Sequence, residues 1–134
     1  MVEVLNKKDY SQIPKVYADG FMDTPWETDW YQIPEFNAET VWVYKEKGEV
    51  VGFIISFLSN DNPYISVLTV KQKFQQRGIA RKLLNHALEY WKAYDYIYIH
   101  VDHERKEAFE LYKSVGFEIK ELRKDDYYMK RELI

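Results

Sequence analysis

The chain has 134 residues, of which 46% are hydrophobic and 31% charged, so we expect one folded, soluble domain over residues 1–134. A net charge of −3 argues against nucleic-acid binding through an overall positive field, and the absence of cysteine excludes disulfides, thiolate metal ligands and a thiol nucleophile. No apolar run reaches the roughly 20 residues of a membrane span, and the N-terminus lacks signal-peptide order, so we expect a cytoplasmic protein without a membrane partner.

The first forty residues predict one strand, one helix and an aromatic segment. Residues 2–5 form a short strand, and residues 9–20 predict a helix in which Pro14 is unfavourable. Residues 21–38 have no clean period and contain Phe21, Trp26, Trp30, Tyr31 and Phe36. We expect a loop or a short, broken helix there.

Three strands are predicted between residues 40 and 70. The first two, residues 40–46 and 49–58, are joined by Lys47-Gly48, a typical hairpin turn. A second turn lies at residues 60–63, and residues 64–70 (YISVLTV) read as a buried, β-branched strand.

Helical and strand patterns alternate in the rest of the chain. One helical face is formed by Ile79, Leu83, Leu84, Ala87, Leu88 and Trp91. Residues 96–102 alternate as a strand, a second helical stripe from Ala108 to Val115 ends at the helix-capping Gly116, and residues 117–122 and 127–133 are two final strands. The strand–helix–strand unit implies one parallel pair, so we predict a mixed α/β fold with helices on a mostly antiparallel sheet.

The junction between the strand at 64–70 and the helix that follows is the first candidate binding site. Free N–H groups and the positive end of a helix dipole suit a phosphate there, and Gly78 and Ala80 are small enough for a ligand to approach closely. The alternative is an ordinary turn with solvated basic side chains. Neither the glycine-rich dinucleotide motif nor the Walker motif is present, so a nicotinamide or P-loop ATP site is not supported.

Two short motifs resemble the GNAT superfamily of acyl-CoA-dependent N-acyltransferases. Gln75-x-x-Gly78-x-Ala80 matches the family's [Q/R]-x-x-G-x-[G/A] loop, between Leu68-x-Val70 and Leu83-Leu84. The segment Ala108-x-x-Leu111-Tyr112-x-x-x-Gly116-Phe117 matches its A-x-x-L-Y-x-x-x-G-F pattern. The match covers roughly residues 40–134, and it implies the GNAT fold, with a central parallel strand pair that splays apart and helices on both faces.

The resemblance also implies that acetyl-CoA is the cosubstrate. Its pyrophosphate would lie on backbone N–H groups of residues 75–80, and the backbone N–H of Leu68 would hold the thioester carbonyl. The cofactor-binding residues implied are Leu68, Thr69, Val70, Gln75, Gln76, Arg77, Gly78, Ile79, Ala80, Arg81 and Arg105. No metal is expected, because the three histidines have no metal-ligand spacing.

Tyr112 matches the position where many family members keep a tyrosine that protonates the departing thiolate, although its spacing also suits simple packing on the helix stripe. The chain departs from the family at two places. Arg105 replaces an asparagine that contacts pantetheine, and could instead reach a cofactor phosphate. The strand at 64–70 lacks the glutamate that several relatives use as general base, which leaves as candidates Asp102, His100, His103, Glu27 and Asp29.

The function implied is transfer of an acetyl group from acetyl-CoA to a primary amine, on a small molecule or a peptide, by direct attack in a ternary complex. Alternatives are a non-catalytic acyl-CoA-binding or sensing module and a structural subunit. Residues 21–38 and the turn near residues 60–62 are expected on the acceptor side, where Asp23, Glu27 and Asp29 favour a cationic amine. A monomer and a homodimer both remain open.

Overall fold

The computed structural model describes residues 1–22 and 40–133, which form seven strands and three α-helices. The strands are β1 (Val2–Val4), β2 (Val41–Glu46), β3 (Glu49–Ser59), β4 (Asn62–Val70), β5 (Tyr96–Asp102), β6 (Glu118–Leu122) and β7 (Asp126–Glu132). The helices are α1 (Ile13–Gly20), α2 (Ile79–Tyr90) and α3 (Lys106–Ser114), with 3₁₀ turns at Lys7–Gln12 and Gln72–Phe74. None of these helices is long and apolar enough to cross a membrane.

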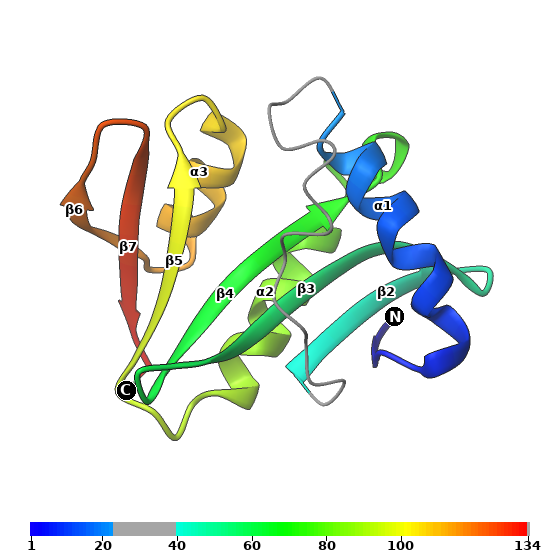
Figure 1. Cartoon of the computed structure of the whole chain (residues 1–134), viewed down its shortest axis with the longest axis horizontal. Coiled ribbons are helices and arrows are strands. Elements are labelled where there is room, and N and C mark those ends of the chain that lie inside the picture. Colours follow the sequence, from blue (N-terminus) through cyan, green and yellow to red (C-terminus); the bar gives the residue numbers. More distant parts are fainter. Residues whose placement is uncertain (23–39, 134) are drawn as a thin grey trace.

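The strands form one sheet in the order β1-β2-β3-β4-β5-β7-β6 (Figure 1). Every neighbouring pair is antiparallel except β4 and β5, which are parallel and are connected through α2. For the described residues, the predicted order of strands and helices and the predicted mixed, mostly antiparallel sheet are therefore confirmed.

Local sequence explains the turns and the helix ends. Lys47-Gly48 and Asn60-Asp61 both have positive φ at two successive residues, as two-residue type I′ hairpin turns require. The predicted helix at residues 9–20 is shorter than expected: a 3₁₀ turn precedes α1, which begins at Ile13 so that Pro14 lies in its first turn, where no hydrogen bond is lost.

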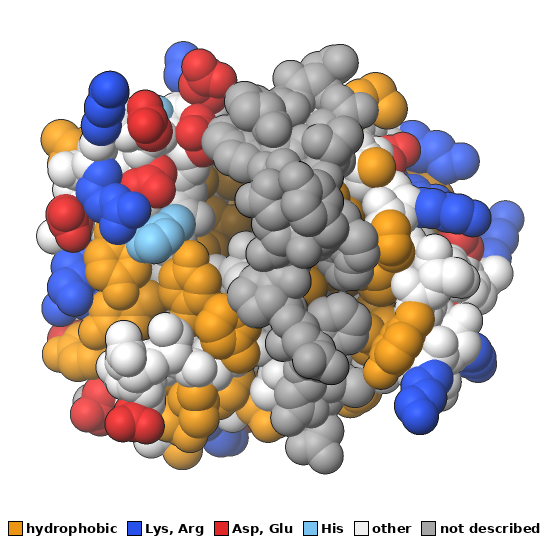
Figure 2. Space-filling model, in the orientation of Figure 1, with side chains coloured by type: hydrophobic (Ala, Val, Ile, Leu, Met, Phe, Trp, Pro, Cys, Tyr) orange, Lys and Arg blue, Asp and Glu red, His pale blue; other side chains and the backbone are white. Residues whose placement is uncertain are grey.

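The two faces of the sheet carry different helices. α2 and α3 pack on one face, where Leu83, Leu84 and Tyr112 join a core with Ile97 and Met129 from the sheet. α1 packs on the other face, against β3 and β4. On this second face, hydrophobic side chains gather over β5 and β7, beside β4 (Figure 2). Tyrosine is counted among the hydrophobic residues in that view.

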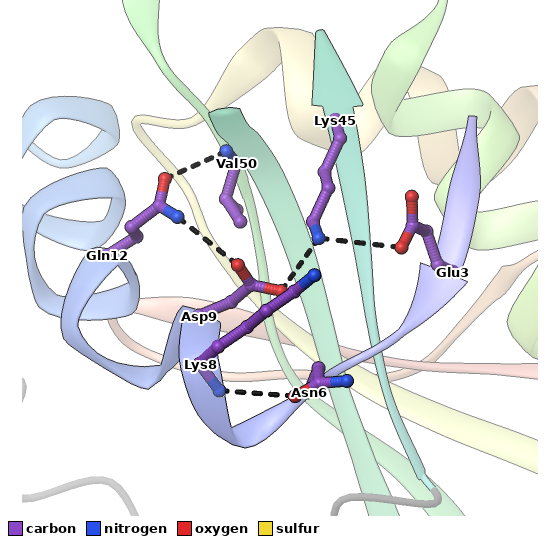
Figure 3. Close-up of polar contacts among 7 residues, drawn as sticks. All are labelled: Glu3, Asn6, Lys8, Asp9, Gln12, Lys45 and Val50. Carbon is purple, nitrogen blue, oxygen red and sulfur yellow. Dashed lines mark hydrogen bonds and ion pairs between the residues drawn. The ribbon is translucent and has the colours of Figure 1, made fainter. Parts of the chain in front are cut away.

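A buried ion pair fixes the 3₁₀ turn before α1 to the sheet. Lys45 Nζ lies 2.7 Å from Asp9 Oδ2 and 3.5 Å from a carboxylate oxygen of Glu3 (Figure 3). The Gln12 side chain links this pair to β3: its amide donates to Asp9 Oδ1, and its carbonyl oxygen accepts from the Val50 N–H at 2.9 Å. The side chains of Asp9 and Lys45 are only 5% and 11% exposed. Removing either charge would leave the other buried without a partner, which is costly.

Lys45→Met should destabilise the protein by about 3 kcal/mol, because it leaves the Asp9 carboxylate buried without its cation. Asp9, chiefly through its hydrogen bond, raises the pKa of Lys45 above its usual 10.5. The pair therefore stabilises the fold fully below about pH 10, and this contribution is lost as the pH rises through the raised pKa.

Urea unfolding of Lys45→Met and of Lys92→Met measures the effect. Lys92, just after α2, forms an exposed pair with Glu89 of that helix, so its substitution should cost under about 1 kcal/mol. Equal losses for the two variants would show that the Asp9–Lys45 pair has no special weight.

Candidate active site

The parallel strands β4 and β5 separate after two residue pairs. Their register pairs Tyr64 with Tyr98 and Ile65 with Ile99 (Figure 1). Among the described residues, β4 and β5 form no further pair. A β-bulge at the same place leaves Ser66 as an extra residue opposite β3. Because a bulge bends its strand, it turns the end of β4 away from β5 and leaves backbone groups of residues 66–70 facing the gap.

Two cavities, of about 550 and 350 Å³, lie along this gap and share one boundary. The residues that line both cavities are Leu68, Arg105, Ala108 and Tyr112. We call these four residues the junction. Leu68 belongs to β4, while the other three come from α3 and the residue before it. A molecule extended through the gap would pass the junction on its way from one cavity to the other.

The smaller cavity contains almost all of the cofactor-binding residues that the sequence predicts. Its walls are the end of β4, the loop after it, the first turn of α2 and one face of α3. Among the predicted residues, Arg77 does not line it, and its guanidinium lies over the Phe74 ring, 5.2 Å from the ring centroid. The Gln75 amide donates to the Val70 carbonyl oxygen at 2.9 Å, so this side chain holds the loop against β4.

The first turn of α2 presents backbone donors to this cavity. Gly78 occupies the N-cap position with φ of +81°. As a glycine it has no side chain to accept a hydrogen bond from the first N–H groups of the helix. The first N–H groups of a helix have no carbonyl partner within it, and they form the positive end of its dipole. An anionic group of a ligand would therefore be favoured here, with Arg81 at the same wall.

Contacts with α1 hold the loop before α2 in place. The Gln72 N–H donates to Asp19 Oδ1 at 2.7 Å, and the Gln72 side-chain amide donates to the Asp19 carbonyl oxygen at 3.1 Å. The loop is thus tied to the helix whose Tyr17 and Phe21 end lines the larger cavity.

Tyr112 lies at the junction with its side chain almost fully buried. A Schellman motif ends α3 just after it: Phe117 N–H donates to the Tyr112 carbonyl, Gly116 N–H donates to Lys113, and Gly116 has φ of +102°. This confirms the predicted cap. Burial raises the pKa of Tyr112 to about 12, and the nearby Arg105 charge acts in the opposite direction. The phenol is therefore protonated at neutral pH.

The larger cavity is lined by polar groups of β4, β5 and the turn before β7, together with aromatic side chains. Its acidic residues are Asp102, Asp125 and Asp126. Tyr64 and His100 also line it, and the Tyr64 hydroxyl lies 3.1 Å from His100 Nδ1. The Tyr128 ring meets the His100 ring edge-on at 4.6 Å. His100 is thereby held between two tyrosines at the point where β4 and β5 begin to separate.

His100 is the best placed of the predicted base candidates. Burial lowers its pKa below the usual 6.5, so the imidazole is neutral and able to accept a proton at neutral pH. Asp102 lines the same cavity but accepts a hydrogen bond from the Glu104 N–H. His103 lies outside both cavities and bonds the Asp126 carbonyl through Nε2. Glu27 and Asp29 lie outside the described residues, as do Asp23 and most of the aromatic segment.

Several residues of the larger cavity are missing from the sequence prediction. Tyr64 is the clearest case, because its hydroxyl reaches His100 only through the parallel pairing of β4 and β5. The turn expected on the acceptor side does not line the larger cavity: Asn60 and Asn62 line a third cavity of about 230 Å³, which shares Tyr64 with the larger one. The long β3–β4 hairpin ends where β4 and β5 are still paired, not where they separate. Within residues 1–22 and 40–133, no group of three acidic or histidine side chains is arranged to hold a metal.

Comparison with known proteins places this architecture among acetyltransferases. The curated N-alpha-acetyltransferase 50 of Danio rerio is 36% identical over 67 residues, which is 48% of this chain and 40% of that relative's own length. The PaiA N-acetyltransferase of Thermoplasma acidophilum, solved in complex with coenzyme A, superposes with a TM-score of 0.84 at 14% identity, covering 98% of both chains.

A second solved structure, Arabidopsis thaliana Naa50 in complex with the bisubstrate analogue CoA-Ac-MVNAL, gives a TM-score of 0.78 at 23% identity, with 98% of this chain and 97% of that chain covered. Residues 7–117 match the sequence model of the Acetyltransferase (GNAT) family. The chain therefore belongs to the GNAT acetyltransferase family.

Proposed function

We propose that the protein transfers an acetyl group from acetyl-CoA to a primary amine by direct attack in a ternary complex. The observation that supports this most is the junction, where Tyr112 stands between a cavity suited to a phosphorylated cosubstrate and a cavity lined by His100 and three carboxylates. Absence of cysteine removes a cysteinyl-enzyme route, which favours direct attack of the amine on the thioester.

The smaller cavity is the proposed cosubstrate site. The first N–H groups of α2 and the side chain of Arg81 would bind the pyrophosphate. Residues 68–70 of β4, which lack a β5 partner among the described strands, would hydrogen-bond the pantetheine arm along the gap. The coenzyme A complex of the structurally similar PaiA N-acetyltransferase supports a CoA molecule in this fold.

The chemistry proposed for the junction needs three groups. When bound, acetyl-CoA supplies a thioester carbonyl for attack by the amine. The Leu68 N–H would donate to the carbonyl oxygen as negative charge develops on it, an effect worth about 3 kcal/mol at such a site. Tyr112 would donate its proton to the departing sulfur, and His100 would accept the proton that the amine loses.

The larger cavity is the proposed acceptor site. Asp102, Asp125 and Asp126 line it and favour a positively charged acceptor. A peptide N-terminus is the first amine to test, because the similar Naa50 structure holds a peptide-based analogue and the curated relative is an N-alpha-acetyltransferase.

Release of free CoA thiol with a panel of amines tests the proposal. The panel contains peptides with a free or a blocked N-terminus, lysine-containing peptides and polyamines, each with acetyl-CoA. Thiol release that requires a free amine, with an acetylated product found by mass spectrometry, would support it. Tight acetyl-CoA binding without turnover on any amine would favour the non-catalytic binding module instead.

His100→Gln should lower kcat by about 10- to 100-fold at pH 7, because the neutral imidazole that takes the proton is gone. The lowered pKa of His100 places the acid limb of the wild-type kcat profile below pH 6.5, where the imidazole becomes protonated. The variant should lack this limb. The measurement is kcat against pH at saturating acceptor.

His86→Gln is the matched control, since His86 lies on the exposed side of α2 beside Trp42 and lines neither cavity. Its profile should match that of the wild type. A His100→Gln enzyme that keeps the acid limb would assign the base to another group.

A further inference from the structure

Arg105, the residue that replaces the family's asparagine, shares one face of α3 with Tyr112. It occupies the N-cap position, and Ala108 and Tyr112 follow at spacings of three and seven residues, so all three point in one direction. All three line both cavities. Helical side chains lean toward the N-terminus of their helix, which directs the Tyr112 ring back toward Arg105. The small Ala108 between them leaves this path open.

The Arg105 guanidinium is held in place by an aromatic ring. Its central carbon lies 4.4 Å from the centroid of the Phe21 ring, at the end of α1, a geometry that favours a cation over an aromatic face. Among the described residues, no carboxylate is close enough to form an ion pair with Arg105. Within residues 1–22 and 40–133, a positive charge without an ion-pair partner is therefore held at the junction.

We propose that Arg105 is a positioning residue for proton donation, whose charge stabilises the Tyr112 phenolate left when the phenol protonates the departing sulfur. This inference rests on the proposed acetyl transfer and adds a role that this chain gains by its arginine.

The proton and electron balance of the step is complete without another reactant. The amine nitrogen forms the new bond to the acetyl carbon, and the carbon–sulfur bond breaks with its electron pair going to sulfur. Sulfur takes the Tyr112 proton and leaves as the CoA thiol. The proton that the amine loses passes to the phenolate through His100 or water. Tyr112 and Arg105 therefore end the cycle unchanged.

A buried phenol needs such help. Burial raises the pKa of Tyr112 to about 12, well above the roughly 8.5 of an ordinary aliphatic thiol, so proton transfer to sulfur would be unfavourable. Arg105 is the charge that opposes this rise.

Other charged or titratable groups face the same space from the packed elements. In the larger cavity they are Tyr17, Tyr64, His100, Asp102, Asp125 and Asp126. In the smaller cavity, Arg81 and Glu107 are added. The acidic residues would disfavour a phenolate, and among the described residues Arg105 is the charge that lowers the pKa of Tyr112. Arg105 therefore has the dominant favourable charge at Tyr112.

The first test is a double-mutant cycle on the single-turnover rate of acetyl transfer. Arg105→Gln should lower this rate about tenfold, and Arg105→Lys, which keeps the charge, should restore most of it. In the Tyr112→Phe background, Arg105→Gln should change the rate less than about twofold, because there is no phenolate to stabilise. Lys106→Gln removes the same charge one residue away on the exposed side of α3, and should leave the rate unchanged.

The second test needs no turnover. Difluorotyrosine is placed at position 112, where its greater acidity brings ionisation into an accessible range, and fluorine NMR follows this one residue against pH. Arg105→Gln should move the midpoint to higher pH, while Arg105→Lys and Lys106→Gln should not. An unmoved midpoint would overturn the proposal even in a protein that acetylates no amine.

Phosphate pairing is the competing role for Arg105. It predicts that Arg105→Gln weakens binding of acetyl-CoA far more than of acetyl-pantetheine, and that the rate loss persists in the Tyr112→Phe background. Those two results together would overturn the positioning role. Equal, small changes in affinity for both thioesters would support it.

Discussion

Gly78→Glu is expected to raise the dissociation constant for CoA by at least about 100-fold, or about 2.7 kcal/mol, while the protein stays folded. The φ of +81° at Gly78 is a conformation that side chains rarely adopt, and a Cβ built there has no heavy atom within 4 Å. The new carboxylate would therefore occupy the open space at the first turn of α2. There it would repel the pyrophosphate and compete for the same backbone donors.

Gly48→Glu is a closely matched control. Gly48 has φ of +80°, also with no atom near a built Cβ, but it lies in the β2–β3 turn. The Gly48→Glu variant should lose about as much stability as Gly78→Glu and keep the wild-type affinity for CoA. Gly78→Asn adds a side chain that tolerates positive φ without the negative charge, so it should lose less affinity than Gly78→Glu. Calorimetry on all three variants makes the comparison, and unchanged affinity in folded Gly78→Glu would remove this loop from the CoA site.

The parts of the fold that the sequence predicts well are those set by neighbours in the chain. Lys47-Gly48 needs only its own backbone conformation to form a hairpin turn, and the apolar stripe beginning at Ile79 depends only on helical spacing. The prediction of where α1 starts is less accurate, because the Lys7–Gln12 turn is held by the ion pair of Asp9 and Lys45. These two residues lie on different elements, and no local pattern pairs them.

The candidate site divides in the same way. The loop from Gln75 to Arg81 is one continuous segment, so its motif identified nearly all of one cavity wall. Tyr64 and His100 meet because two parallel strands have a particular register, which alternation within each strand does not specify. Arg105 is visible in the sequence as a departure from the family, but its contact with Phe21 on α1 requires the folded structure.

Tyr112→Phe is expected to lower kcat by about 10- to 1,000-fold and to leave CoA affinity and stability nearly unchanged. The substitution keeps the ring, which packs edge-on against Phe117 at 5.9 Å, and removes the one atom able to donate a proton. A residual rate should remain, because the Leu68 N–H and the positioning of the two substrates persist. Tyr94→Phe, on a ring that packs against Trp91 away from both cavities, is the matched control and should keep full activity.

The pH profile of kcat tests whether the group that donates the proton has an ordinary or a raised pKa. A tyrosine with a pKa near 10 would lose its proton, and the enzyme its activity, as the pH rises through that value. Because burial raises the pKa of Tyr112 to about 12, the acid form persists, and the wild-type kcat should not fall between about pH 8 and 10.5. Within that range the ratio of wild-type to Tyr112→Phe rates should therefore stay constant. If Tyr112→Phe turns over at the wild-type rate while chemistry is rate-limiting, Tyr112 is a packing residue and water must protonate the thiolate.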